Sequence, residues 1–215
     1  NYGFMDKYLF SFNIRRDGAS KFAPERRWGT FPSASFAWRA KNEKFLKNVD
    51  WINDLKFRAS IGTIGNNRIQ DYLYITTFRN DGQVYYGVNN GISYAYYSAG
   101  LVNENLKWES TESRNLGLDL TMFKQRLTLT VDVYDNRSRD LLLNVPVAPT
   151  FGYSTQIQNI GKTSNKGVEF QISGTIIKNP GGFNWTANYN MSFNTNKVLA
   201  LGPGQDFFFA APSWG

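Results

Sequence analysis

The sequence predicts an all-β fold, in which the chain forms a segment of an antiparallel transmembrane β-barrel. Two observations carry this prediction: long stretches alternate between apolar and polar residues, and the apolar stripes all end toward the same side. The clearest stretch is 183–196, where aromatic and aliphatic side chains fall on one face and Asn, Ser and Thr on the other. Because successive side chains of a strand point to opposite faces, this pattern indicates a strand between an apolar and an aqueous environment.

Seven strands are predicted from alternation and flanking turns. They lie at about residues 6–17, 31–40, 54–64, 108–122, 126–140, 166–178 and 183–197. The connections alternate in length: those near 123–125 and 179–182 are short, whereas 18–30, 65–107 and 141–165 are long. The 41–53 connection is intermediate, and we predict a short helix around Glu43 to Lys47. Short turns at one end and long loops at the other are typical of outer-membrane barrels.

The apolar stripes become polar toward the long-loop end of each strand. The stripe through Leu116 continues into Arg114, and the stripe through Val133 continues into Asp135. Stripes of about four to six outward residues fit an apolar band about 25 Å tall that is crossed by tilted strands.

Trp38 and Trp185 fall near the short-turn ends of their strands, where an aromatic girdle would lie at a membrane interface. The alternative is a soluble β-sandwich with these aromatics in an ordinary core. A sandwich would need neither connections sorted by length nor a shared edge of the stripes.

Composition excludes several kinds of chemistry. The chain has no His and no Cys, which removes Ser-His-Asp and Cys-His nucleophile systems and zinc sites of the common types. We therefore expect no enzyme, no catalytic residue, no metal and no cofactor. The formal charge of +7 raises the possibility of nucleic-acid binding, but Lys and Arg are scattered over turns and strand ends, so we expect no nucleic-acid partner.

The mean hydropathy is −0.43, and no stretch approaches the roughly 18 apolar residues of a spanning helix. If the chain crosses a membrane, it crosses with strands. Nothing at Asn1 resembles a signal peptide, and Trp214-Gly215 reads as a cut within a loop, so we expect a piece of a longer exported protein.

Charged residues of the inward, polar face point to one cluster. Lys56 and Arg58 face inward near the short-turn end of their strand, and Asp119 and Asp132 should lie at a similar height. We predict a lumenal charge cluster of these four residues. A purely structural role, as mutually paired wall residues, is the alternative.

The long loops are rich in aromatic residues that lie next to Gly and Asn. Such side chains can stack on sugars or grip peptide side chains, or they can pack the loops on one another. The candidate ligand or partner contacts are Tyr85, Tyr86, Tyr94, Tyr96, Tyr97, Phe207 and Phe208.

Six blocks of sequence together resemble one known family, the SusC/RagA TonB-linked outer-membrane proteins of Bacteroidetes. The blocks are IRRDGASKF (14–22), FPSASFAWR (31–39), LKFRASIGTIGNN (55–67), NENLKWESTESRNLGLDL (103–120), VDVYDNRSRDLLL (131–143) and NIGKTSNKGVEFQISGTI (159–176). They are in family order and cover most of the chain.

The resemblance implies that residues 1–215 are part of a barrel of about 22 strands with a plugged lumen, in the outer membrane of a Gram-negative cell. It also implies TonB-dependent import of glycans, peptides or similar large nutrients, with a SusD-like surface lipoprotein over the extracellular loops. The implied partners are that lipoprotein, TonB acting through a plug domain, the glycan or peptide ligand, and outer-membrane lipid and lipopolysaccharide.

The chain departs from the family pattern because it contains neither a plug domain nor a TonB box, and seven strands cannot close such a barrel. Energy coupling therefore cannot be assigned to these residues. The alternative function is a structural, secretion-associated or adhesin-type barrel without solute transport.

Overall fold

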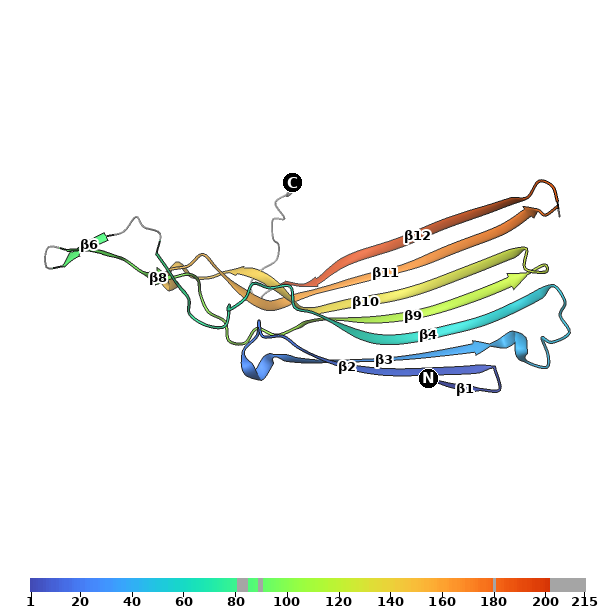
Figure 1. The fold of residues 1–215 in the computed structure, drawn as a ribbon, viewed down its shortest axis with the longest axis horizontal. Helices are drawn as coiled ribbons and strands as arrows, with labels where there is room; N and C mark the ends of the chain where they lie inside the picture. The colour runs from blue at the N-terminus through green and yellow to red at the C-terminus, as the bar shows by residue number, and fades with distance from the viewer. Residues whose placement is uncertain (81–84, 89–90, 180, 202–215) are drawn as a thin grey trace.

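The computed structural model describes residues 1–80, 85–88, 91–179 and 181–201 of the 215-residue chain. Its main feature is a curved sheet of eight antiparallel strands, in the order β1-β2-β3-β4-β9-β10-β11-β12 (Figure 1). The strands are β1 (Tyr2–Phe4), β2 (Tyr8–Gly18), β3 (Trp28–Arg39), β4 (Ile52–Asn66), β9 (Glu109–Met122), β10 (Leu127–Pro146), β11 (Thr155–Ile177) and β12 (Trp185–Ala200). All seven predicted strands are confirmed.

Strand β1 is the one member of the sheet that the sequence did not predict. Its three residues are too few to show alternation. It joins β2 through Met5 and Asp6, which have φ of 53° and 52°, and Lys7 N–H donates to the Phe4 carbonyl over 3.1 Å. Two adjacent positive φ values make the tight turn that matches strand twist, and here the turn replaces the first two residues of the predicted strand 6–17.

Pairing between strands aligns the predicted faces across the whole sheet. One row of partners runs through Tyr8, Trp38, Phe57, Leu118, Val131, Phe170 and Met191. The next row, on the other face, includes Lys56, Asp119, Thr130, Gln171 and Asn190. The sheet therefore has one apolar face and one polar face, as the alternation predicts.

The apolar face has no second layer packed on it within the described residues. Phe12 is 69% exposed, Leu116 63% and Phe193 59%. A sandwich buries such a face against another sheet, so the sandwich alternative is wrong. In the described part of the chain, no helix is long and apolar enough to cross a bilayer.

Aromatic side chains gather at the short-turn end of the apolar face. Trp38 stacks on Phe57 with ring centroids 5.5 Å apart, and Trp51 stacks on Phe123 at 6.3 Å. Trp185 opens β12, also at this end. The two predicted Trp positions are thus part of a wider aromatic group.

The connection 141–165 was predicted to be a long loop, and this is wrong. Strands β10 and β11 continue past a bulge to Pro146 and from Thr155, which leaves 147–154 between them. Asp140 has φ of 57°, and the register shifts between Ser138, Leu141 and Leu142. The bulge breaks the period-two pattern, so the alternation stops there although the strand does not.

The other long connection, between β4 and β9, contains two small antiparallel strand pairs. Strand β5 (Phe78–Arg79) pairs with β8 (Tyr97–Ser98), and β6 (Tyr85–Val88) pairs with β7 (Gly91–Tyr94). The long connections lie at one end of the sheet and the short ones at the other (Figure 1). The 40–51 link at the short end is nonetheless longer than 19–27 and 147–154 at the long end.

The helix predicted around Glu43 to Lys47 is wrong in place and in type. A 3₁₀ turn, η2, occupies Ala40–Asn42, and 44–48 forms turns. Glu43 instead fastens this link to the sheet: its carboxylate accepts from Lys7 Nζ and Tyr8 Oη, each over 2.8 Å, and from Trp38 Nε1 over 3.3 Å.

These donors make the stability of the link depend on pH. The hydrogen bond from Lys7, followed by that from Tyr8, lowers the pKa of Glu43 below its ordinary 4.5. A carboxylate with a lowered pKa stabilises the fold above its unfolded pKa, and this contribution is lost as pH falls through the folded value. Glu43→Gln should therefore lower the melting temperature of the full-length protein above about pH 5, and the difference from wild type should shrink in stronger acid.

Glu25→Gln is the matched control, because Glu25 is exposed in the 3₁₀ turn η1 (Pro24–Arg26). Melting curves recorded across the acid range check the prediction. A Glu43→Gln difference that does not change with pH would contradict it.

Candidate functional site

The four charged residues of the predicted cluster come together on the polar face. Lys56 and Arg58 lie on β4, Asp119 on β9 and Asp132 on β10. Lys56 is the register partner of Asp119, while Arg58 and Asp132 both pair with Gly117. Two adjacent rows of the sheet therefore bring all four side chains into contact.

Asp119 is the centre of the cluster. Its Oδ2 lies 2.9 Å from Lys56 Nζ and 2.8 Å from Arg58 Nε, and its Oδ1 lies 3.0 Å from Arg58 Nη2. Arg58 Nη2 also donates to Asp132 Oδ2 over 3.1 Å. The forked guanidinium thus bridges two carboxylates on neighbouring strands, which is a geometry that Lys cannot provide.

Gly117 makes this bridge possible. A Cβ at this position would lie 2.6 Å from both Arg58 Cζ and Asp132 Oδ1, so any larger residue would displace the pair. Asp132 Oδ1 is buried and has no hydrogen-bond partner among the described residues. Next to it, a polar hollow of about 330 Å³ is lined by groups that include Thr130, Glu169 and Gln171.

The predicted aromatic contacts are only partly described. Tyr96 and Tyr97 are 68% and 48% exposed. Of Tyr85, Tyr86 and Tyr94, only the backbone is described, in the β6–β7 hairpin. Phe207 and Phe208 lie outside the described residues.

The most deeply buried side chains belong to connections, and sequence reasoning missed them. Phe22 and Leu106 are 0% and 1% exposed, and they pack with Ala19. The surrounding residues are Ile69, Leu73, Trp108, Leu142 and Ile157. We call these eight residues the loop core. It joins two connections, β2–β3 and β4–β9, to the extended ends of β10 and β11.

Polar side chains fix the backbone around the loop core. Trp108 Nε1 donates to the Arg27 carbonyl over 2.9 Å, and Asn103 Nδ2 donates to the Ile157 carbonyl over 2.8 Å. The Asn159 amide accepts from Lys107 N–H and donates to the Lys107 carbonyl, over 3.0 and 2.9 Å. The sequence does hold a signal that could have predicted this core: large apolar residues lie within otherwise polar connections.

A polar groove of about 810 Å³ lies beside the loop core. Amide side chains contribute much of its lining, including Asn103, Asn105, Gln156, Gln158 and Asn159, and Arg26 and Lys107 add charge. Amides offer both donors and acceptors, so the groove suits sugar hydroxyls or a peptide backbone. Among the described residues, no group of three or more acidic side chains is placed to hold a metal ion.

The pairing within the charge cluster can be tested by exchanging the charges of Arg58 and Asp119. Arg58→Asp or Asp119→Arg alone leaves like charges together and should destabilise the full-length barrel by about 1–3 kcal/mol. The double exchange restores the pair between positions 58 and 119 but leaves like charges against Asp132 and Lys56, so it should recover part of the loss. Urea unfolding in lipid vesicles measures the effect. Ser173→Ala, on the same polar face, is the control and should stay within about 0.5 kcal/mol. Additive effects of the two changes would contradict the pairing.

Comparison with known proteins places this geometry in a family. The family model "TonB dependent receptor-like, beta-barrel" matches residues 1–213. TonB-dependent receptor P39 of Formosa agariphila is 40% identical over 206 residues, which cover 96% of this chain and 19% of the relative. TonB-dependent receptor SusC of Bacteroides thetaiotaomicron is 38% identical over 218 residues, which cover 96% of this chain and 21% of SusC.

Solved structures agree with the sequence relatives. The RagAB peptide importer in its closed-closed state matches with a TM-score of 0.87 and 29% identity, over 98% of this chain and 22% of that one. Its open-open state matches with a TM-score of 0.86 and 30% identity, over 100% of this chain and 23% of that one. The chain spans about a fifth of the length of the curated relatives that it matches. It belongs to the TonB-dependent receptor family of β-barrels and forms part of such a barrel.

Proposed function

We propose that the chain is part of the wall of a TonB-dependent outer-membrane transporter that imports glycans, peptides or similar large nutrients. The observation that carries this is the continuous apolar face of a single-layer sheet, in a chain that the barrel family matches over residues 1–213. Lipid covers that face in the outer membrane, and the polar face lines the interior. The rest of the longer protein supplies the remaining strands, the plug domain and the contact with TonB.

The wall itself is a rigid part of the transporter. The likeness to RagAB differs by only 0.01 in TM-score between its closed-closed and open-open states. Nearly equal similarity to both states fits a wall segment whose shape those two RagAB structures share. The Lys56, Arg58, Asp119 and Asp132 cluster fits this role, because it ties three strands together on the interior face.

The loop core provides a preorganised surface for a SusD-like lipoprotein and for the nutrient. Connections that pack on one another pay less ordering entropy on binding than mobile loops do. The amide-rich groove and the exposed Tyr96 and Tyr97 lie in this region and offer contacts for sugar or peptide. The proposal assigns this segment wall and binding surface, and no catalysis.

Removal of one side chain from the loop core tests this role. Phe22→Ala in the full-length protein should leave a cavity that costs about 3–5 kcal/mol and loosens both connections of the loop core, while the membrane strands stay folded. Co-purification of the SusD-like lipoprotein should fall several-fold, and growth on the imported polymer should slow. Reduced gel mobility on heating would confirm that the barrel itself remains folded.

Phe45→Ala is the control, because Phe45 is 69% exposed in the link at the opposite end of the sheet. It should leave both lipoprotein binding and growth unchanged. If the barrel is in the outer membrane but neither Phe22→Ala nor deletion of the whole gene affects uptake of any polymer, the protein is a structural or adhesin-type barrel.

A further inference from the structure

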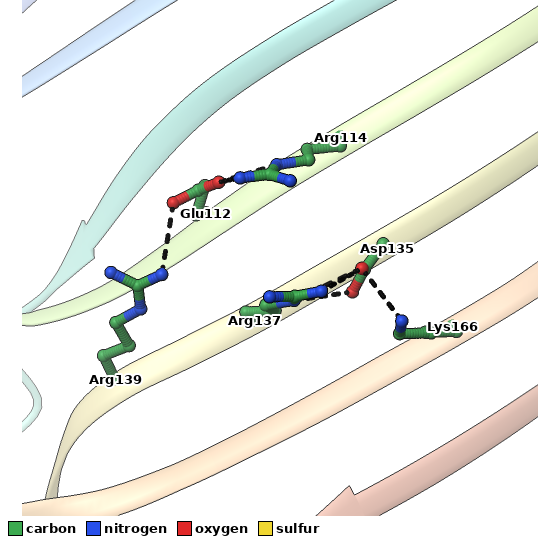
Figure 2. Close-up of polar contacts among 6 residues, drawn as sticks. All are labelled: Glu112, Arg114, Asp135, Arg137, Arg139 and Lys166. Atoms are coloured by element: carbon green, nitrogen blue, oxygen red, sulfur yellow. Dashed lines mark hydrogen bonds and ion pairs between the residues drawn. The ribbon is translucent and has the colours of Figure 1, made fainter. Parts of the chain in front are cut away.

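Six charged side chains gather at the long-loop edge of the apolar face, in two neighbouring triads of ion pairs. They are Glu112 and Arg114 on β9, Asp135, Arg137 and Arg139 on β10, and Lys166 on β11 (Figure 2). We call this group the basic edge. It begins directly beyond the last apolar residues of the same face, Leu116, Val133 and Val168, which are themselves register partners.

Each carboxylate of the basic edge holds two cations. Arg114 Nε donates to Glu112 Oε1 over 2.7 Å, and Arg139 Nη2 lies 3.6 Å from Glu112 Oε2. Arg137 Nη2 and Lys166 Nζ lie 2.9 and 3.2 Å from Asp135 Oδ2 (Figure 2). The two acids therefore hold four basic side chains along three strands.

The two carboxylates of the basic edge are less exposed than its four cations. The side chains of Glu112 and Asp135 are 24% and 22% exposed, whereas those of Arg114 and Lys166 are 54% and 57% exposed. Four cations and two carboxylates leave a net charge of +2 on the group. Lys197 adds another positive charge on β12, opposite Ser164 and one strand beyond the basic edge.

This arrangement presents donors to an external anion. Each Arg has five N–H groups, and a single carboxylate satisfies only some of them. Exposed ion pairs contribute about 0–1 kcal/mol, so internal pairing alone gives little reason to gather these groups at the border of an apolar surface. Arg and Lys together bind phosphate through charge-assisted hydrogen bonds.

We propose that the basic edge binds the phosphate groups of lipid A, the phosphorylated glycolipid of the outer leaflet. This rests on the proposed function, which puts the long-loop end outside the cell. The phosphate bonds to the exposed ends of Arg114 and Lys166, above the less exposed Asp135 carboxylate that lies between them, and Arg137 and Arg139 are close by. The acyl chains of the same molecule lie along Leu116, Val133 and Phe193, which are 63%, 46% and 59% exposed.

The two parts of the surface match the two parts of one amphipathic molecule. The apolar row Leu116, Val133 and Val168 ends and the charged row Arg114, Asp135 and Lys166 follows two residues farther along each of three adjacent strands. A free anion in solution would use the cations alone. A phosphorylated lipid uses the cations and the apolar row together, which makes the lipid the better fit.

Binding of purified lipid A to the full-length protein in detergent tests the proposal. Arg114→Gln with Lys166→Gln should weaken binding about tenfold or more, because each lost charge-assisted bond is worth about that factor. Dephosphorylated lipid A should bind the wild type and the variant equally weakly. Equal affinity of the variant and the wild type for lipid A would overturn the proposal, as would equal competition by phosphatidylglycerol or by millimolar inorganic phosphate.

Two further variants control for folding and for charge. Arg114→Lys with Lys166→Arg keeps both charges and should retain binding within about threefold. Arg126→Gln with Lys178→Gln removes the same charge at the short-turn end and should leave binding unchanged. Loss in either control would overturn the proposal. Nutrient uptake is measured in the same strains, so absent uptake with intact lipid A binding would count against the proposed function alone.

Discussion

The structure depends on one constraint: a strand that crosses a bilayer must find hydrogen-bond partners for all its backbone groups in neighbouring strands. Strands β9 and β10 pair without a register shift from Met122 and Leu127 to Ser110 and Arg139. Because paired residues share a face, this unbroken ladder aligns every apolar stripe with the next. The apolar face, the polar face and the shared edge of the stripes all follow from this register.

The connections are held in place differently at the two ends of the sheet. At the short-turn end, tight turns and the Glu43 carboxylate fasten the links directly to the strands. At the long-loop end, the connections bury Phe22 and Leu106 in a core of their own, beyond the sheet. A single-layer sheet has no core between layers, so the tightest packing among the described residues is found in the connections rather than on a face of the sheet.

Sequence alternation predicted the seven long strands, the two faces and the four-residue charge cluster, because each follows from the period of two. It failed where that period is interrupted. The bulge at Asp140 hid the extended ends of β10 and β11, and β1 was too short to alternate. The loop core was missed because Phe22 is far in sequence from Leu106 and Trp108 and meets them only through tertiary packing. The ligand contacts proposed at Tyr96 and Tyr97 stay predictions.

The central claim is that the apolar face meets lipid and the polar face meets water. These 215 residues contain no Cys, so a single Cys substitution along 115–121 places one spin label in this segment of the full-length protein, once any Cys elsewhere is replaced by Ser, and the labelled protein is studied in liposomes. The account predicts that oxygen, which partitions into lipid, relaxes labels at 116, 118 and 120, and that a water-soluble nickel complex relaxes labels at 115, 119 and 121. Equal access of the nickel complex to both sets of positions would contradict the account.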